Sequence, residues 1–341
     1  MTGATGATGA NGVNAVNGAN GANGVNGLLA GIDRWLLCPA PAERLAAFRV
    51  LVGAFATVYL AVRFVAFRAL ADNDASSFDP VGILWWLRAP LSDRLWIAAL
   101  IATLVAGVAF TAGVRFRVSG PTFAVLLLTI TTYRSSWGQL LHFENLLVLH
   151  ALVVGCSRSA DAWSLDARRT DTRAGAHTRY GWPLRLAACV SVATYVLAGV
   201  AKLRYGGMAW ITGDSLRHHV AYSAVRLQLL GGDPSPLAGP LVEHGWLFRP
   251  AAAITVVLEL AAPLALIGRR SRTGWVTGTW LLHAGIAATM FVVFPYPLSL
   301  IAFAPLFDLE RGVAAARSRF SRCRPRAAEC MAVPVAGARR R

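Results

Sequence analysis

The chain has 341 residues, of which 55% are hydrophobic and only 15% are charged. Soluble domains carry about 25% charged residues, so this composition excludes an ordinary soluble protein. It predicts an all-α, polytopic integral membrane bundle. The net charge of +16 would suggest nucleic acid for a soluble chain. No nucleic-acid motif accompanies that charge, and the arginines concentrate in loops and in the C-terminal tail, so we expect no nucleic-acid partner.

Three regions follow one another along the chain. Residues 1–30 are rich in Gly, Asn and Ala and have no packable face, which predicts a disordered tail. They lack the charged start and apolar core of a signal peptide. Residues 31–310 are predicted to form the transmembrane helical domain. Residues 311–341 hold nine arginines and form a basic tail.

Apolar stretches of membrane-spanning length predict about eight transmembrane helices. Their predicted bounds are 45–67, 95–114, 119–133, 139–157, 183–203, 249–267, 274–293 and 297–310. The third and eighth are short for a full span. Pro295 and Pro297 should break the chain between the last two.

The distribution of arginine between loops predicts the orientation. With both termini in the cytoplasm, the internal regions hold 22 arginines and the external loops hold 8. This excess follows the positive-inside rule and predicts a multi-pass cell-membrane protein with cytoplasmic N- and C-termini. The external loops 68–94 and 204–248 are long, and their tryptophans suit anchoring in the membrane interface.

Ionisable residues inside membrane spans are costly and are by default candidates for function. The predicted spans contain Arg49, Arg63, His142, Glu144, His150, Lys202, Glu259 and His283. The two arginines lie at opposite ends of the first span, where structural roles are commoner.

Lys202 is the only lysine, so the other 32 of the 33 basic residues are arginines. Arginine cannot act as a base, whereas lysine in an apolar pocket can lose its proton. Lys202 is therefore a candidate catalytic base near the external face. The alternative is a lysine at a helix end that reaches the lipid headgroups, although Arg204 already supplies a cation there.

The remaining candidates predict a polar lining for the same site. Helical spacing places His142, Asn145 and His150 on one side of the fourth span. Interhelical hydrogen bonding is the alternative role for these side chains. Glu259 lies near mid-membrane and should be protonated or paired with Arg49, Arg63 or a histidine. His283, in the seventh span, is the last candidate for substrate binding.

Three segments resemble a known family. They are "YVLAGVAKL" around Lys202, "SWGQLLHFENLLVLHALVVGCSRSADAWSLDA" with its W-S-x-D turn, and "MFVVFPYPLSLIAFAPLF" near the end. In this order and spacing they resemble the membrane part of the vitamin K-dependent gamma-carboxylases and bacterial HTTM (horizontally transferred transmembrane) domain proteins. The resemblance covers roughly residues 40–310.

The resemblance implies chemistry on a reduced quinone of the vitamin K or menaquinone type. The lysine of the family's AG-x-x-KL segment deprotonates the hydroquinone, which then reacts with oxygen, and this lysine matches Lys202. A family histidine assists, and His142 is its nearest match, one residue out of register. The carboxylases also have a large extramembrane region after the membrane part. This chain ends 31 residues after residue 310, so glutamate carboxylation is not expected.

Other functions stay open at this stage. The chain could instead be a non-enzymatic membrane partner or an export and maturation factor for a secreted peptide, acting through its external loops. A haem carrier using His142, His150 and His283 is a third reading. The five cysteines form no CxxC pair, and the adjacent His218 and His219 should diverge, so no disulfide and no metal site are predicted.

Overall fold

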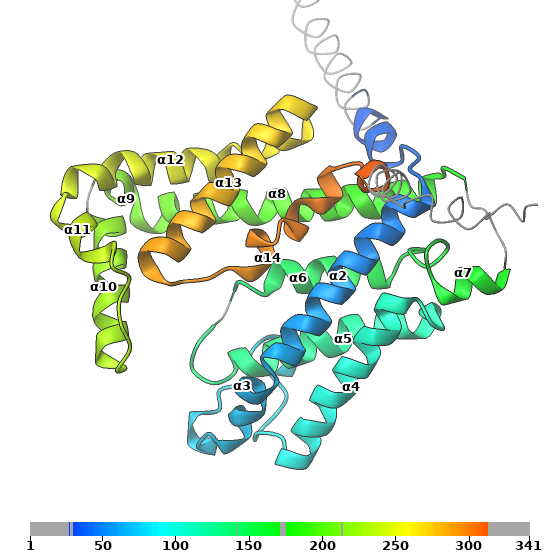
Figure 1. The fold of residues 1–341 in the computed structure, drawn as a ribbon, viewed down its shortest axis with the longest axis horizontal. Helices are drawn as coiled ribbons and strands as arrows, with labels where there is room; N and C mark the ends of the chain where they lie inside the picture. Colours follow the sequence, from blue (N-terminus) through cyan, green and yellow to red (C-terminus); the bar gives the residue numbers. More distant parts are fainter. Residues whose placement is uncertain (1–26, 28–29, 141, 171–174, 213, 313–341) are drawn as a thin grey trace, which may run out of the picture.

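The computed structural model describes residues 27, 30–140, 142–170, 175–212 and 214–312, and within these residues the fold is helical without a β-strand (Figure 1). An isolated bridge pairs Ala40 with His177. Nearly all of the predicted tails 1–30 and 311–341 lies outside the described residues.

The first half of the chain forms α2 (Ala42–Val62), α3 (Phe64–Arg68), η1 (Ala69–Asp72), η2 (Ala75–Ser77), η3 (Gly82–Leu84), α4 (Asp93–Ala112), α5 (Phe116–Ser135), α6 (Asn145–Gly155) and α7 (Leu165–Thr170). The second half forms α8 (Thr178–Gly206), α9 (Ala209–Thr212), α10 (Ser215–Leu229), α11 (Ala238–Glu243), η4 (Gly245–Leu247), α12 (Phe248–Leu260), η5 (Ala262–Leu266), α13 (Arg269–Met290), α14 (Pro295–Leu298) and η6 (Ile301–Leu306).

Three of the described helices, α2, α4 and α8, are both long enough and apolar enough to cross a membrane. Helices α5 and α13 have the length, with 20 and 22 residues, but their sequences are less apolar. The remaining predicted spans are shorter: α6 has 11 residues, and α12 has 13 before η5 continues in the same region. The helical membrane bundle is confirmed, while its helices are less uniform in length than the sequence predicted.

Two predicted spans were wrong in their helical extent. The span 139–157 contains helix only from Asn145 onward, because Gly138 adopts a positive φ of 77° and the described part of the following segment is not helical. The span 297–310 is the short α14 and the 3-10 turn η6 rather than a continuous helix. The predicted break before it is confirmed, since residues 291–294 separate α13 from Pro295.

Helices α2, α4, α5 and α6 form one bundle, in which α4 packs on α2, α5 on α4 and α6 on α5. Its buried core includes Phe48, Trp96, Phe123 and Leu127. The bundle brings the start of α6 close to the C-terminal part of α2, where Tyr59 donates a hydrogen bond to Glu144.

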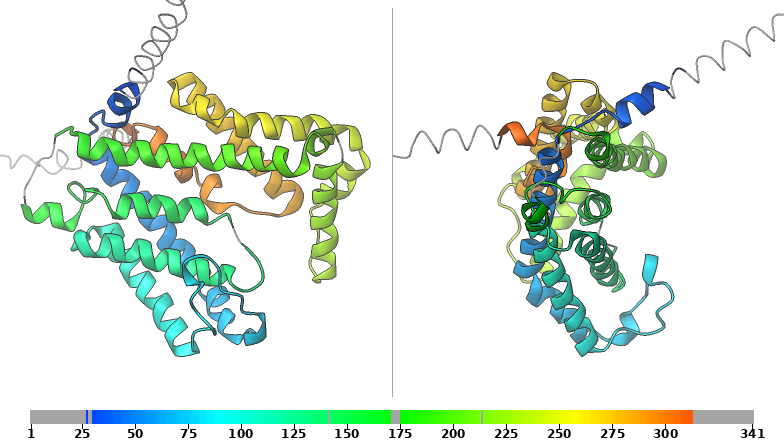
Figure 2. Two further views of the ribbon diagram at one scale, coloured as in Figure 1. Left: turned by 180° about the vertical axis from the view of Figure 1, so that it is seen from behind. Right: turned by 90° about the vertical axis from the view of Figure 1, so that its right-hand side faces the viewer.

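Helix α8 joins this bundle to the C-terminal helices. It packs on α2 and α6 on one side and on α12, η5 and η6 on the other. A second core around Tyr195, Trp275 and Phe303 fills the latter interface. Figure 2 shows α8 running beside α6, with α10 projecting from the region where α8 ends.

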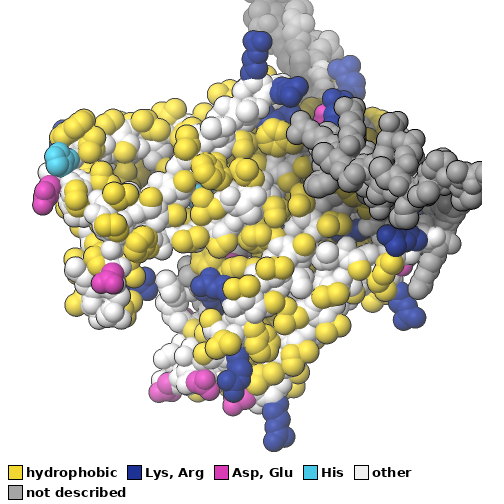
Figure 3. Space-filling view, viewed as in Figure 1, with side chains coloured by type: hydrophobic (Ala, Val, Ile, Leu, Met, Phe, Trp, Pro, Cys, Tyr) yellow, Lys and Arg dark blue, Asp and Glu magenta, His cyan; other side chains and the backbone are white. Residues whose placement is uncertain are grey.

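The outer surface is apolar where a lipid bilayer would contact it. Hydrophobic side chains cover most of the face in Figure 3, and most charged side chains lie near its margins. Only 33% of the most apolar stretch of α4, and 33% of that of α8, is buried within the protein. Valines such as Val62 and Val105 are 79% and 64% exposed. Exposed apolar surface of this extent is expected for a membrane protein.

The W-S-x-D turn, residues 163–166, ties the bundle together at the end opposite Lys202. The Asp166 carboxylate accepts hydrogen bonds from the backbone N–H groups of Arg115 and Phe116, at 3.0 and 2.8 Å. The buried Arg49 guanidinium donates to the carbonyls of Ser159 and Trp163, at 2.9 and 2.5 Å. These contacts give Arg49 and the turn a structural role.

Candidate functional site

A cleft of about 890 Å³ lies between α8, α12 and α13, with α10 and α11 at its side. Apolar side chains supply most of its wall, among them Leu146, Ala198, Val220, Ile254, Leu258 and Ile286. Four of the six predicted site residues also line it: His142, Lys202, Glu259 and His283. The fold therefore gathers into one cleft side chains that are up to 141 positions apart in the sequence.

Lys202 and Glu259 form an ion pair in the wall of this cleft. The Lys202 Nζ donates to Glu259 Oε1 at 2.5 Å, and the two side chains are 24% and 8% exposed. The amine also lies 5.4 Å from the centre of the Trp210 ring, a cation–π distance. The partners expected for Glu259, namely Arg49, Arg63 or a histidine, were wrong, because α12 packs on α8 and brings Glu259 to Lys202 instead.

Gly199 explains why the two helices approach so closely. A side chain at this position would place its Cβ 3.1 Å from Glu259 Cβ and 3.0 Å from Leu260. The absence of a side chain lets α12 lie directly against α8, less than one turn before Lys202. The AG-x-x-KL segment thus combines a cleft-lining Ala198, a contact glycine and the amine on neighbouring parts of one helix.

His283 forms a second polar group on the same wall. Its Nε2 lies 2.9 Å from the Tyr195 hydroxyl, and its buried Nδ1 has no hydrogen-bond partner among the described residues. Tyr195 is seven residues before Lys202, so both side chains lie on one face of α8. The ring of Phe294 lies 5.0 Å from that of His283 and 6.0 Å from that of His142.

His142 reaches the cleft from the segment before α6, where it is exposed and not helical. Two residues later, the buried Glu144 accepts hydrogen bonds from Tyr59 and from Arg134, the latter at 2.6 Å. The Arg134 guanidinium also lies 5.4 Å from the Phe143 ring. This network holds Phe143 and Glu144, the two residues that follow His142 at the cleft.

The structure does not bring Asn145 and His150 to the cleft. Asn145 is exposed at the first residue of α6. His150 is fully buried, with its Nδ1 2.7 Å from the Tyr296 hydroxyl. Its Nε2 lies 3.1 Å from both the Ala187 carbonyl and the Ser191 hydroxyl. Both ring nitrogens are thus occupied by protein groups, which fits the interhelical role considered for this histidine.

Residues 38–310 match the family model of the HTTM domain. The chain belongs to this family. No curated protein and no solved structure matches the chain. The matched region begins just before α2 and ends after η6, so it includes the helical bundle and the whole cleft.

Several residues of the HTTM-domain cleft were missed by the sequence analysis. Tyr195, Trp210, His219 and Phe294 all line it. Tyr195 could have been found from its spacing to Lys202, since i and i+7 share a helix face. Trp210 lies in the short helix α9, Phe294 in a loop and His219 in α10, and their place at the cleft depends on tertiary packing.

The cleft of this HTTM domain has the features of a site for a largely apolar small molecule. Its volume lies within the usual range for ligand pockets, and a few polar groups converge on an otherwise apolar wall. Glu259 Oε2 is buried without a hydrogen-bond partner among the described residues. An unpaired buried acceptor is costly, so a ligand hydroxyl that donates to it would be bound favourably.

Proposed function

We propose that this HTTM-domain protein binds a reduced quinone of the vitamin K or menaquinone type and abstracts a hydroxyl proton from it. The observation that carries the proposal is the Lys202–Glu259 pair in the wall of an apolar cleft. The resemblance of the AG-x-x-KL segment to that of the vitamin K-dependent gamma-carboxylases supports the same chemistry for Lys202.

The shape and polarity of the cleft suit such a ligand. A naphthoquinol has a flat aromatic ring system, two hydroxyl groups and an apolar side chain. The aromatic rings of Phe294 and Trp210 offer surfaces for the ring system, and the aliphatic wall suits the side chain. His142 and His283 both lie close to the Phe294 ring and could each exchange a hydrogen bond with a hydroxyl.

The ion pair accounts for the proton step. In the proposed step the pair holds one proton when the hydroquinone binds, with that proton on Glu259 and with Lys202 as the free amine. The Lys202 amine then takes a hydroxyl proton, which leaves an ammonium beside the hydroquinone anion, and the apolar wall strengthens their attraction. Reaction of the anion with O2 then gives the quinone epoxide. One oxygen atom stays in the epoxide and the other leaves as water with the two hydroxyl hydrogens.

The cleft is proposed to open at the outer membrane face, with both termini in the cytoplasm. The distribution of arginine between the predicted loops supports this orientation. The external region 204–248 contributes α10 and α11 to the side of the cleft, so a lipid-soluble ligand could enter from the outer leaflet.

The test is an aerobic and anaerobic assay of the purified protein with reduced menaquinone or reduced vitamin K. Oxygen-dependent formation of the epoxide, detected by mass spectrometry, is the expected result. Lys202→Arg keeps the cation but removes the amine that can lose its proton, and turnover should fall by roughly 10²-fold or more. Arg204→Lys, which retains a cation two residues on, is the matched control.

A second function is favoured by α10, whose exposed apolar residues share one face. Tyr222, Val225 and Leu229 are 67%, 51% and 82% exposed and are spaced for a helix stripe. Such a stripe could hold a secreted peptide. For a peptide partner, Lys202→Arg would be silent, while polar substitutions at Val225 and Leu229 would abolish peptide export or crosslinking.

A further inference from the structure

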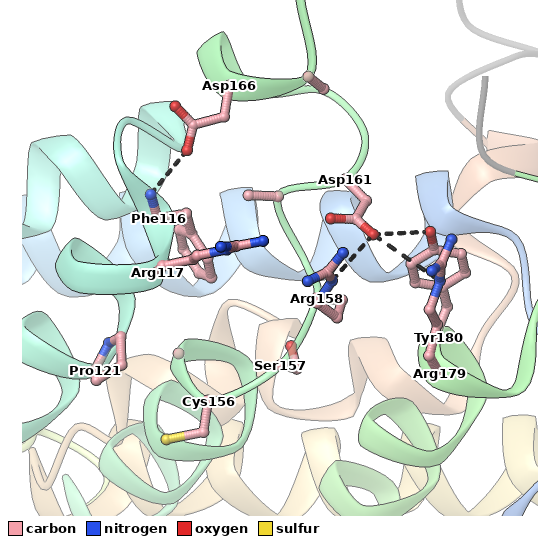
Figure 4. Close-up of a pocket in the computed structure, with 13 residues that line it drawn as sticks. Phe116, Arg117, Pro121, Cys156, Ser157, Arg158, Asp161, Asp166, Arg179 and Tyr180 are labelled. Atoms are coloured by element: carbon pink, nitrogen blue, oxygen red, sulfur yellow. Dashed lines mark hydrogen bonds and ion pairs between the residues drawn. The ribbon is translucent and has the colours of Figure 1, made fainter. Parts of the chain in front are cut away.

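A second cleft, of about 750 Å³, lies at the other end of α8 (Figure 4). It is formed where α5 begins, where α6 ends and where α8 begins. Tyr180 in its wall is 22 residues from Lys202 on the same helix, about 33 Å apart at 1.5 Å per residue. A bilayer's hydrocarbon core is about 30 Å thick, so the two clefts lie close to opposite faces of the membrane.

Three arginines from three separate segments line this cleft. Arg117 belongs to the first turn of α5, Arg158 follows α6, and Arg179 belongs to the first turn of α8. Figure 4 shows the Arg117 and Arg158 side chains both extending into the space between α5 and the segment after α6. All three side chains are exposed, and guanidinium groups that line one cleft attract an anion to it.

The acidic side chains in the cleft do not balance these cations. Asp161 Oδ2 lies 3.4 Å from Arg158 Nε and 4.0 Å from Arg179 Nε. Strong charge-assisted bonds of this kind are about 2.7–2.9 Å long. The same Oδ2 accepts a 3.0 Å hydrogen bond from the Tyr180 hydroxyl. This oxygen thus accepts two hydrogen bonds, and its contacts with the two arginines are long.

The Asp166 carboxylate already accepts hydrogen bonds, whereas the Arg117 guanidinium has no such partner in the described part of the chain. Both Asp166 oxygens accept backbone N–H groups at the start of α5. In the part of the chain that the structure describes, no hydrogen bond or ion pair engages the Arg117 guanidinium. The cleft therefore presents one uncommitted guanidinium and two weakly committed ones. An anion bound between them would gain short, charge-assisted hydrogen bonds.

The opposite wall of the cleft is apolar. Phe116, Pro121 and Ala160 contribute to it. Gly120 and Gly155 make α5 and α6 approach so closely that a Cβ on either would lie 2.5 or 2.6 Å from the other's carbonyl oxygen. Arg117 and Arg158 thus lie near a close contact of α5 and α6, and apolar side chains line the same cleft.

We propose that this arginine cleft binds a phosphate group, supplied either by an anionic phospholipid headgroup or by free phosphate. Three guanidinium groups match the several oxygens of a phosphate, and hydrogen bonds between charged partners are stronger than those between neutral groups. The site is independent of the Lys202 cleft and of any quinone chemistry there.

The experiment measures ligand binding by delipidated, full-length protein in a neutral detergent. Native mass spectrometry and thermal stabilisation are recorded with phosphatidylglycerol, with phosphatidylcholine and with inorganic phosphate. The test variant is Arg117→Gln/Arg158→Gln. The matched control is Arg88→Gln/Arg94→Gln, which removes the same charge from exposed positions outside the cleft. Arg117→Lys is a milder variant that keeps the charge.

The expected result is binding of phosphatidylglycerol or inorganic phosphate that weakens about tenfold or more in the test variant and is unchanged in the control. Loss with phosphatidylglycerol alone identifies a lipid headgroup, and loss with both identifies phosphate itself. The proposal would be overturned if binding weakened equally in the test and control variants. It would also be overturned if phosphatidylcholine and phosphatidylglycerol were retained equally, or if neither phosphatidylglycerol nor inorganic phosphate bound. A variant that does not fold is replaced by Arg117→Lys, for which a smaller loss is expected.

Discussion

Lys202 and Glu259 are 57 residues apart in the sequence, and their side chains form a 2.5 Å hydrogen bond across the interface of α8 and α12. Each group alone would be an uncompensated charge beside an apolar wall. The only lysine in the sequence therefore acquires its partner through the packing of α8 on α12.

The first prediction concerns the stability of this pair. Lys202→Met or Glu259→Leu alone should lower the free energy of unfolding by roughly 3 kcal/mol, because each leaves one buried polar partner unpaired. Because Lys202 is partly exposed and Glu259 is buried, Lys202→Met, which leaves Glu259 unpaired, should be the costlier of the two changes. The double variant should recover much of the loss. Thermal unfolding of detergent-solubilised protein measures this, and additive losses would contradict a direct interaction.

The second prediction concerns Gly199. Gly199→Val should push α12 away from α8, because the new Cβ would lie 3.0–3.1 Å from Leu260 and Glu259, closer than ordinary van der Waals contact. We expect lower thermal stability together with loss of quinone binding. Gly274→Val, in α13 where no atom lies within 4 Å of the added Cβ, is the matched control. Equal effects at both sites would rule out helix approach as the cause.

The third prediction separates a structural histidine from a site histidine. His150→Ala should cost about 2–4 kcal/mol of stability, since it removes a buried side chain and leaves the Tyr296 hydroxyl without its partner. Its remaining folded fraction should bind quinone normally.

For His283→Ala the same prediction expects a smaller loss of stability and a larger loss of quinone affinity than for His150→Ala. His283→Ala should cost less stability, because one hydrogen bond to Tyr195 is lost, while quinone affinity falls about fivefold or more. Binding per folded molecule, measured for both variants in parallel, checks this. A normal affinity in His283→Ala would show that this histidine does not contact the ligand.

The fourth prediction concerns the anchor of the His142 segment. Glu144→Gln should weaken the contacts with Arg134 and Tyr59 and loosen the chain before α6. Hydrogen exchange of residues 142–144 should become at least severalfold faster. Glu243→Gln, at an exposed position in α11, is the control and should change nothing there. Unchanged exchange in Glu144→Gln would mean that the segment is held by other contacts.

Much of the fold could be predicted from the sequence, because long apolar stretches predict membrane helices. The positions of α2, α4 and α8 follow from that signal alone. The start of α6 could not be predicted in this way. Leu140, His142 and Phe143 belong to the stretch that predicted a span, although the chain there is not helical. Tertiary contacts of Glu144 and Arg134 decide that region, and no periodicity reveals them.

The candidate site could be predicted in part for a similar reason. The rarity of ionisable groups in apolar segments singled out Lys202, Glu259 and His283, and the structure places them in one cleft. The partner of Glu259 could not be inferred, because nothing local distinguishes Lys202 from Arg49 or Arg63 as a neighbour. His150 gave the same signal as His283, and only packing shows that its ring nitrogens are occupied.

The most direct test of the proposed proton abstraction is the anaerobic ultraviolet difference spectrum of reduced menaquinone bound to the protein at neutral pH. Without oxygen no epoxide can form, so the spectrum reports only whether the bound hydroquinone has lost its proton. The account predicts the red-shifted spectrum of the hydroquinone anion with wild-type protein and the neutral spectrum with Lys202→Arg. A neutral spectrum with the wild type, or the anion spectrum with both proteins, would contradict it.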